Sequence, residues 1–415
     1  MTDTLSAAAV RAHLLAGDEI ALLDLREEDP FAQAHPLWAA NLPLARLELD
    51  AWRRIPRRDT LIVLYGEYEG ADLAPLGAER LAALGYTRVH RLEGGLEGWR
   101  QAGGELFRDV NVPSKAFGEL VEHERHTPSL PAEEVKALID AKADVVVLDA
   151  RRFDEYQTMS IPGATSVPGA ELVLRVRELA PDPATRVIVN CAGRTRSIIG
   201  TQSLVNAGIP NPVAALRNGT IGWKLAGQAL DHGASRRAPE AGEANRVKAR
   251  AAAEAVARRA GAQWVDAEGL VRLEVPGRTL YRFDVRTPEE YDAGHLPGFA
   301  SAPGGQLVQE TDHSVPVRGA RIVLTDDDGV RAPMTASWLA QMGWEVYVLA
   351  PQPAAAYSER GAAPAPQPAT PATGRYRRPY EGTDAPAEAM QAYLDWEFGL
   401  VAQLGRDGTH RFKVV

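Results

Sequence analysis

The fold of this chain is decided by the stretch Val187-Ile-Val-Asn-Cys-Ala-Gly-Arg-Thr-Arg-Ser197. An apolar, β-branched run ends at Asn190, and a helical pattern of apolar residues begins at about Ser197. The six residues between them, Cys191 to Arg196, are predicted to form the loop of a strand–loop–helix turn. Such a turn directs backbone N–H groups and the positive end of the helix dipole into the loop.

Cys191 is the only cysteine of the 415-residue chain, and Arg194 and Arg196 share its loop. These cations and the helix terminus predict a lowered thiol pKa, so that Cys191 is largely thiolate near neutral pH and nucleophilic. The alternative is a buried and inert cysteine, which is the commoner state of a lone thiol. The two cations and Gly193 favour the reactive interpretation.

The composition restricts the class of protein. Residues are 45% hydrophobic and 24% charged, and the net charge of -9 gives no reason to expect nucleic acid as a partner. A single cysteine excludes an intrachain disulfide and a multi-cysteine metal site, and no metal or cofactor is predicted. The first residues include no basic region, and no uncharged apolar stretch approaches membrane-spanning length, so we expect a cytoplasmic protein with no membrane partner.

Three segments of the chain repeat one plan. Each begins with an apolar strand that ends in an acidic-x-basic signature, at Asp24-Leu-Arg26, Asp149-Ala-Arg151 and Asp284-Val-Arg286. A second apolar strand follows in each repeat. The loop after this strand is taken to begin at Tyr65 in the first repeat, at Cys191 in the second and at Thr325 in the third, which lie 41, 42 and 41 residues after the signature aspartates. A helix and a third strand then follow each time. Alternating helices and short apolar strands predict a parallel sheet covered by helices on both faces.

These repeats resemble rhodanese-like (thiosulfate sulfurtransferase-like) domains. The resemblance rests on the signatures, on the Cys191–Arg196 loop and on motifs between and after them. They are Phe153-Asp-Glu-Tyr156, Ile161-Pro-Gly-Ala164, Leu216-Arg-Asn-Gly-Thr-Ile-Gly-Trp223, Leu92-Glu-Gly-Gly-Leu-Glu-Gly-Trp99, Pro288-Glu-Glu-Tyr291 and Gly294-His-Leu-Pro-Gly298. The predicted fold is therefore α/β, with three tandem rhodanese-like domains, each a parallel sheet flanked by helices.

The predicted boundaries follow the repeats. Residues 1–104 form a first, non-catalytic domain, residues 129–233 a catalytic domain with Cys191, and residues 262–350 a third, non-catalytic domain. The corresponding loops, Tyr65–Gly70 and Thr325–Val330, contain no thiol. They contain carboxylates, whose negative charge repels an anionic substrate. Residues 105–128 interleave apolar and charged residues, which predicts that they pack the first domain against the second.

Three further segments are assigned from composition. Residues 241–260 are predicted to form one exposed connecting helix, and residues 351–374 an extended Pro/Ala linker. Residues 375–415 form a C-terminal tail with one amphipathic helix. We expect this helix to replace the Gly-Gly…Trp motif that the third domain lacks.

The resemblance implies a two-step sulfur transfer. Cys191 attacks the outer sulfur of a small anionic donor such as thiosulfate, and the resulting persulfide passes its sulfur to cyanide or to a thiol. Arg194 and Arg196 are assigned to catalysis, as the cations that hold the donor. Substrate binding is assigned to Ala192, Gly193, Thr195, Ser197 and Arg217, and a structural role to Asp149 and Arg151. The physiological donor and acceptor and the oligomeric state do not follow from the sequence.

Two other functions compete with this one. A cysteine-dependent phosphatase carries arginine six positions after its cysteine. Here that position is Ser197, and this departure from the pattern disfavours a phosphatase. A non-enzymatic rhodanese-like binding or redox-sensing module would have Cys191 oxidised rather than sulfurated. Among sulfurtransferases, the arginine-containing loop favours thiosulfate over mercaptopyruvate.

Overall fold

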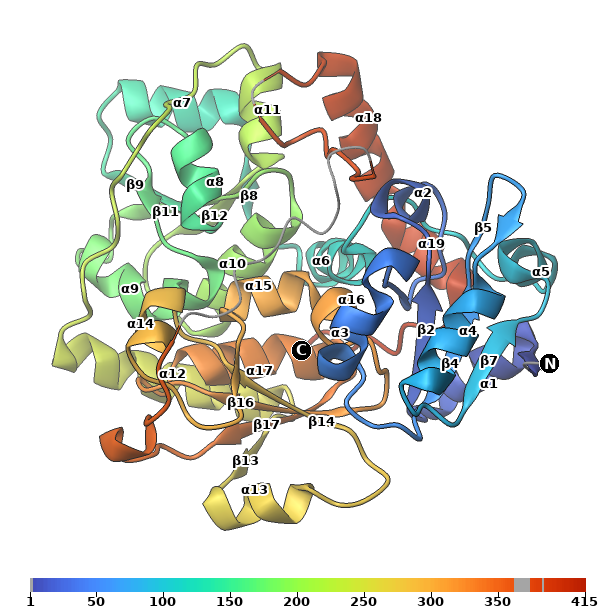
Figure 1. Cartoon of the computed structure of the whole chain (residues 1–415). Helices are drawn as coiled ribbons and strands as arrows, with labels where there is room; N and C mark the ends of the chain where they lie inside the picture. The colour runs from blue at the N-terminus through green and yellow to red at the C-terminus, as the bar shows by residue number, and fades with distance from the viewer. Residues whose placement is uncertain (1–2, 362–373, 383) are drawn as a thin grey trace.

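The computed structural model describes residues 3–361, 374–382 and 384–415. Within them, three five-stranded sheets contain only parallel strand pairs, and we call the surrounding units the first, second and third domains (Figure 1). In sheet order, the first holds β3 (Ala39–Asn41), β2 (Ile20–Asp24), β4 (Leu61–Tyr65), β7 (Val89–Leu92) and β1 (Thr4–Leu5). The second holds β10 (Thr165–Ser166), β9 (Val145–Asp149), β11 (Arg186–Asn190), β12 (Val213–Leu216) and β8 (Ser129–Leu130). The third holds β15 (Ala300–Ser301), β14 (Leu280–Asp284), β16 (Arg321–Thr325), β17 (Glu345–Leu349) and β13 (Gln263–Val265).

The three sheets share one strand order, with the fourth main strand of each domain at the centre. That central strand is buried along its length in the first domain and along all but its first residue in the other two. Strands covered on both faces need apolar residues at successive positions rather than an alternating pattern, as the sequence provides. The predicted fold class is confirmed.

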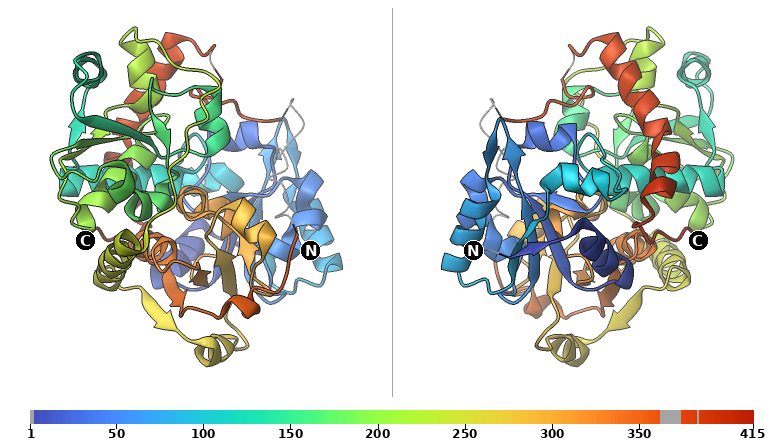
Figure 2. Two further views of the ribbon diagram at one scale, coloured as in Figure 1. Left: turned by 90° about the vertical axis from the view of Figure 1, so that its left-hand side faces the viewer. Right: turned by 90° about the vertical axis from the view of Figure 1, so that its right-hand side faces the viewer.

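Helices cover both faces of each sheet (Figures 1 and 2). The first domain contains α1 (Ala7–Ala16), α2 (Glu28–Gln33), α3 (Leu47–Arg54), α4 (Ala74–Ala83), α5 (Gly95–Gln101) and the 3-10 helix η1 (Leu44–Arg46). The second contains α7 (Ala132–Asp140), α8 (Phe153–Thr158), η2 (Gly169–Glu171), α9 (Leu172–Leu179), α10 (Thr195–Asn206) and α11 (Gly219–Leu225). The third contains α13 (Ala267–Leu273), α14 (Pro288–Ala293), α15 (Gly304–Gln309), α16 (Thr311–Ser314) and α17 (Arg331–Gln341).

The sheet register corrects the alignment of the three loops. Asn190 pairs with Asp149, Tyr65 with Asp24 and Thr325 with Asp284, so each pair is separated by 41 residues. The counterparts of Cys191 are therefore Gly66 and Asp326, not Tyr65 and Thr325. The count from the sequence was wrong by one residue because Asn190, although polar, is the last residue of β11.

Helix α6 (Val112–Arg125) lies at the centre of the molecule and packs against α10 of the second domain. Its Phe117 ring contacts the rings of Trp338 and Phe412 edge-on, with centroids 6.0 and 5.2 Å apart. The Ser114 hydroxyl donates a 2.7 Å hydrogen bond to the carbonyl of Gln309. The connection between the first two domains is thus a buried helix that also contacts the third.

The first domain shares its hydrophobic core with the third, through α6, rather than with the second alone. Ile20 forms an antiparallel bridge with Arg318, and the Tyr281 hydroxyl donates a 2.6 Å hydrogen bond to the carbonyl of Arg54. The expectation that the first domain packs on the second is therefore incomplete, because contacts made by the third domain could not be read from the connecting segment.

Helix α12 (Glu243–Arg259) connects the second and third domains and is not fully exposed. Ala249, Ala253, Val256 and Ala257 are buried, and the helix packs against α9 and α17. A face of small residues allows this close packing, which the sequence interpretation overlooked because alanine carries so little apolar surface.

The C-terminal tail contains two helices, α18 (Ala387–Phe398) and α19 (Leu400–Asp407). In α18, Met390, Tyr393 and Leu394 form a cluster with Ile221 of α11. In Figures 1 and 2, α18 lies beside α11. Helix α18 therefore packs on the second domain, and the expectation that this aromatic helix completes the third domain is wrong. The rest of the tail packs elsewhere, since α19 contacts α6 and the Lys413 N–H donates to the Gln341 carbonyl of the third domain at 2.8 Å.

The predicted Pro/Ala linker begins as ordered structure. Residues 354–356 form the 3-10 helix η3, Glu359 bridges His295, and the Tyr357 hydroxyl donates a 2.7 Å hydrogen bond to the carbonyl of Asp326. Residues 362–373 of this linker lie outside the described residues. The start of the segment is therefore part of the third domain and not a tether.

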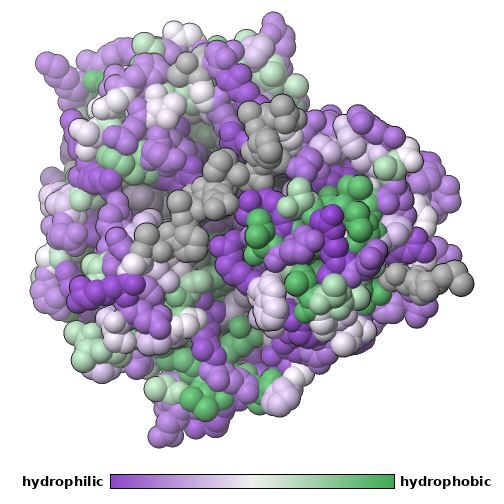
Figure 3. All heavy atoms as spheres, in the orientation of Figure 1, coloured by the Kyte–Doolittle hydropathy of each residue, from purple (hydrophilic) through white to green (hydrophobic). Residues whose placement is uncertain are grey.

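The surface of the described residues is largely hydrophilic on the face shown in Figure 3, with hydrophobic residues in separate groups. Along the described part of the chain, every helix is too short or too polar to span a bilayer.

Candidate active site

Cys191 follows directly on β11, at the carboxyl edge of the second sheet, where ligands bind in open parallel sheets. The thiol is unpaired and 2% exposed. Its loop is held by the start of α11, because Thr220 N–H donates to the Cys191 carbonyl at 2.9 Å and Ile221 N–H to the Ala192 carbonyl at 3.0 Å. The loop conformation is therefore fixed by helix N–H groups that have no partner inside their own helix.

Gly219 permits this close approach. Its φ is +55°, and a Cβ atom at this position would lie 2.3 Å from the Cys191 carbonyl oxygen and 2.7 Å from that of Gly193. Any other residue would push the loop away from α11. The glycine of the Leu216–Trp223 motif thus acts on the geometry of the cysteine loop.

The environment of the thiol differs from the expected one. The thiol lies 3.4 Å from the Ser197 hydroxyl, which itself donates to the Arg194 carbonyl at 2.8 Å. Burial raises the pKa of Cys191, while the charge of Arg196 and the hydrogen bonds with Ser197 lower it without overcoming burial. The expected lowered pKa is therefore not found, because the sequence could not show that the loop is covered.

Arg196 is the cation that acts on the sulfur. Its guanidinium forms two hydrogen bonds with Glu155 of α8, at 2.6 and 2.8 Å. Burial disfavours the Glu155 carboxylate, but the pairing with Arg196 brings its pKa down to about 2. Glu155 therefore stays ionised and fixes the guanidinium beside Cys191. Sequence reasoning missed Glu155.

Arg194 is committed to other partners. Its guanidinium donates to Glu119 of α6 at 2.7 and 2.9 Å, pairs with Glu122, and donates to the Asn218 side chain at 3.1 Å. It also lies 4.0 Å from the centre of the Phe398 ring. Two carboxylates neutralise this cation, so the geometry does not fit the expected role of holding the donor. Arg194 instead joins the cysteine loop to α6 and α18.

Removing Arg194 is expected to destabilise the protein. The Arg194 and Glu119 side chains are only 3% and 4% exposed, and Arg194→Ala would leave a buried carboxylate unpaired. Loss of one partner of a buried pair costs about 3–5 kcal/mol. We expect a clearly lower midpoint of thermal unfolding for Arg194→Ala, measured by circular dichroism, and no change for the exposed Arg217→Ala. Equal midpoints for both variants would contradict this interpretation.

The other predicted binding residues lie in different places. Arg217 is exposed and directs its guanidinium to Ser129, at 3.2 Å from the hydroxyl, so its assignment to the donor site is not supported. Gly193 and Ala192 are buried in the loop, and Gly193 faces α18. The Thr195 hydroxyl is buried and has no hydrogen-bond partner among the described residues.

Asp149 and Arg151 form a buried bidentate pair, at 2.9 and 2.7 Å, and Arg151 also donates to the Met159 carbonyl at 2.5 Å. The same arrangement joins Asp24 to Arg26 and Asp284 to Arg286 in the other domains. It ties the end of one strand to the segment after the next helix. A scaffold of this kind is needed in every copy, whether or not the copy has a thiol.

The third domain fills its own loop with a carboxyl group. Asp326, the counterpart of Cys191, accepts hydrogen bonds from the N–H groups of Gly329, Val330 and Ala332, at 3.0, 3.1 and 2.8 Å. Arg331 and Glu290 repeat the Arg196–Glu155 pair, again 41 residues apart. The loop thus retains its cation and amides but has a carboxyl group in place of a nucleophile, and burial together with Asp328 raises the pKa of that carboxyl group to about 8.

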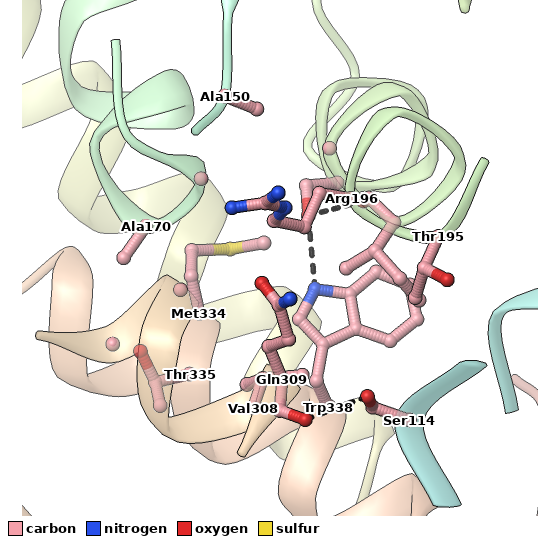
Figure 4. Close-up of a pocket in the computed structure, with 16 residues that line it drawn as sticks. Ser114, Ala150, Ala170, Thr195, Arg196, Val308, Gln309, Met334, Thr335 and Trp338 are labelled. Atoms are coloured by element: carbon pink, nitrogen blue, oxygen red, sulfur yellow. Dashed lines mark hydrogen bonds between the residues drawn. The ribbon is translucent and has the colours of Figure 1, made fainter. Parts of the chain in front are cut away.

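A pocket lies between the second and third domains, with Arg196 in its wall (Figure 4). Residues at corresponding positions of the two repeats line it, including Ile199 and Met334, and the Trp338 indole N–H donates to the Ser203 hydroxyl at 2.9 Å. Cys191 does not line this pocket. The pocket is a product of packing two related domains face to face.

Comparison with known proteins agrees with this architecture. The family model described as the rhodanese-like domain matches residues 6–102, 131–226 and 275–350. The chain belongs to the rhodanese-like family. A solved structure of the thiosulfate sulfurtransferase from Pseudomonas aeruginosa is 55% identical, with a TM-score of 0.96 and complete coverage of both chains.

Two curated relatives match shorter parts of the chain. The thiosulfate sulfurtransferase of Azotobacter vinelandii is 27% identical over 202 residues, which are 44% of this chain and 73% of that protein. The HTH-type transcriptional regulator Rv0324 of Mycobacterium tuberculosis is 33% identical over 91 residues, 22% of this chain. The match spans only 39% of that regulator's length.

Proposed function

We propose that this rhodanese-type protein is a thiosulfate sulfurtransferase that carries the transferred sulfur on Cys191. The observation that carries the proposal is the position of one unpaired thiol, at the carboxyl edge of the second sheet, beside Arg196 and inside a loop of backbone N–H groups. The similarity over the full chain to a protein of that name supports the same activity.

In the first step, the Cys191 thiolate attacks the outer sulfur of thiosulfate. A new sulfur–sulfur bond forms, the bond inside thiosulfate breaks, and sulfite leaves with the bonding electron pair. Arg196 faces the charge that develops on the donor, and Glu155 holds Arg196 in place. In the second step, cyanide or a thiolate attacks the outer sulfur of the persulfide, and Cys191 leaves as thiolate.

The loop of the third domain indicates which backbone N–H groups of the cysteine loop bind the anionic persulfide and the anionic donor. The side-chain oxygens of Asp326 accept hydrogen bonds from the N–H groups of Gly329, Val330 and Ala332, whose counterparts in the second domain are those of Arg194, Thr195 and Ser197. We assign the binding of the persulfide and of the donor oxygens to these three amides. Arg194, Thr195 and Ser197 then contribute through the backbone rather than through charge.

The competing functions have less support. A redox sensor would have Cys191 oxidised rather than sulfurated, whereas the solved structure that is similar over the full chain is named as a sulfurtransferase. A phosphatase of the cysteine-dependent kind would need arginine where Ser197 stands. The unpaired cysteine is compatible with the reducing cytoplasm, the compartment that we propose.

The test of this function is the mass of the intact protein after incubation with thiosulfate. We expect the mass to increase by one sulfur atom, located on the peptide that contains Cys191, and to return to its starting value when cyanide is added. A control incubation with sulfite should leave the mass unchanged. If thiosulfate adds no sulfur over the pH range in which the protein is folded, the proposed function is wrong.

A further inference from the structure

The end of helix α18 covers the cysteine loop with two buried polar side chains, Tyr393 and Glu397. A Cβ atom on Gly193 would lie 3.2 Å from Oε2 of Glu397 and 3.2 Å from Cε1 of Tyr393. Glu397 therefore contacts the loop two residues beyond Cys191, and its charge contributes to the raised pKa of the thiol. This helix runs beside α11 in both views of Figure 2.

Glu397 has one satisfied and one unsatisfied oxygen. Oε1 accepts a 2.9 Å hydrogen bond from the Tyr393 hydroxyl. Oε2 has no hydrogen-bond partner among the described residues. Glu397 is also completely inaccessible to solvent, so water does not take the place of that partner. A buried carboxylate oxygen without a donor is costly, so this atom calls for a partner that the chain itself does not supply.

The carboxylates around Glu397 already outnumber the cations before Glu397 itself is counted. On α6, Lys115 is paired with Asp109 at 2.5 Å, and Glu119 and Glu122 are paired with Arg194. Glu397 is therefore a further acid in a cluster that already has one carboxylate in excess, and the phenols of Tyr380 and Tyr393 and the Cys191 thiol are the other titratable groups near it.

Burial and the neighbouring Glu119 raise the pKa of Glu397 to about 8, while Lys115, the Tyr393 hydroxyl and Arg194 oppose the rise. The carboxyl group can thus hold or release a proton close to neutral pH. This is the range in which a residue exchanges protons efficiently during turnover.

We propose that Glu397 takes the proton from a thiol acceptor and passes it to Cys191 during the second half of sulfur transfer. The proposal rests on the function proposed above. It assigns the site to thiol acceptors, which arrive protonated, and it gives the orphaned Oε2 a substrate partner: the S–H group that approaches the loop at Gly193.

The reaction balances without an oxidant or a reductant. The acceptor S–H gives its proton to the Glu397 carboxylate, and the acceptor sulfur attacks the outer sulfur of the Cys191 persulfide. The sulfur–sulfur bond of the persulfide breaks, the acceptor leaves as a new persulfide, and Cys191 becomes a thiolate. Glu397 then returns the proton to Cys191. Sulfite is mostly a dianion at pH 8 and has no proton to give up, so its attack on the persulfide, which re-forms thiosulfate, does not use Glu397.

The experiment compares two acceptors in the full-length protein carrying Glu397→Gln. We expect the ratio of dithiothreitol turnover to the exchange of labelled sulfite into thiosulfate at pH 8 to fall about 10²-fold, the usual contribution of a proton-transfer group. Asp395→Asn makes the same chemical change on the exposed side of α18 and should leave the ratio at the wild-type value. An acceptor thiol that is already ionised at pH 8 should restore the ratio in Glu397→Gln.

Tyr393→Phe tests the same idea without changing the carboxyl group. Loss of the hydroxyl donor disfavours the charged form of Glu397, so the rise of dithiothreitol turnover with pH should move to higher pH, while the profile of sulfite exchange keeps its position. An unchanged acceptor ratio in Glu397→Gln, an equal loss with both acceptors, or an unshifted profile in Tyr393→Phe would overturn the proposal. Absence of persulfide in the wild-type protein would instead refute the function itself.

Discussion

Replacing Cys191 by serine is expected to abolish sulfur transfer from thiosulfate to cyanide, with a loss of at least about 10³-fold in kcat. The thiol is the one nucleophilic sulfur in the loop, and a serine hydroxyl is far too weak an acid to ionise there. Steady-state thiocyanate formation measures the loss. The midpoint of thermal unfolding should change little, because oxygen replaces sulfur without leaving a large cavity.

Cys191→Ala is the companion variant, since it removes the hydroxyl as well. Both variants should also fail to gain mass on incubation with thiosulfate. Turnover near the wild-type rate in either variant would mean that another group carries the sulfur. Since the chain has no second cysteine, that result would exclude a persulfide mechanism altogether.

The repeated architecture was predictable because it leaves local signals. Each domain places an aspartate at the end of an apolar strand and an arginine two residues later, and in each the two side chains form a buried pair. A pair so close in sequence is visible without a structure. The fold follows, because the same signal recurs three times with strands and helices in the same order.

The partners of the loop arginines were harder to predict. Glu119 lies 75 residues before Arg194 and on a connecting helix, so no periodicity links the two. The Glu155–Arg196 pair did leave a signal: the same residue types recur as Glu290 and Arg331, again 41 residues apart. Aligning the repeats on their strand ends rather than on the cysteine would have revealed it.

The cover over the active site could not be predicted at all. The sequence identifies an aromatic helix near the C-terminus, but nothing local states which domain receives it. Its position on the second domain, with Glu397 against Gly193, depends on a hydrophobic cluster with Ile221, far away in sequence. That contact is also why burial, rather than the two arginines, decides the direction in which the Cys191 pKa moves.

Arg196→Ala is expected to lower kcat/KM for thiosulfate by about 10²–10³-fold, the usual effect of removing one group that stabilises developing negative charge. It should also change the pH dependence of persulfide formation. The reactive form is the thiolate, and Arg196 lowers the pKa of Cys191 against the effect of burial. Without Arg196 the pKa rises further, so the increase of the rate with pH moves to higher pH. Single-turnover mass measurements with thiosulfate alone give this profile without interference from the titration of cyanide.

The charge of Glu155 needs a control of its own, since Arg196→Ala leaves that carboxylate unpaired beside the loop. The double variant Arg196→Ala/Glu155→Gln removes the stranded charge. If Arg196 acts on the donor, the double variant stays impaired, whereas recovery would mean that the loss came from Glu155.

Arg196→Lys should recover only part of the activity, because an ammonium cannot keep both hydrogen bonds to Glu155. Arg217→Ala removes an exposed arginine of the same domain and should keep the wild-type kcat/KM and pH profile. If Arg217→Ala lowered kcat/KM as much as Arg196→Ala does, general surface charge rather than Arg196 would attract the donor.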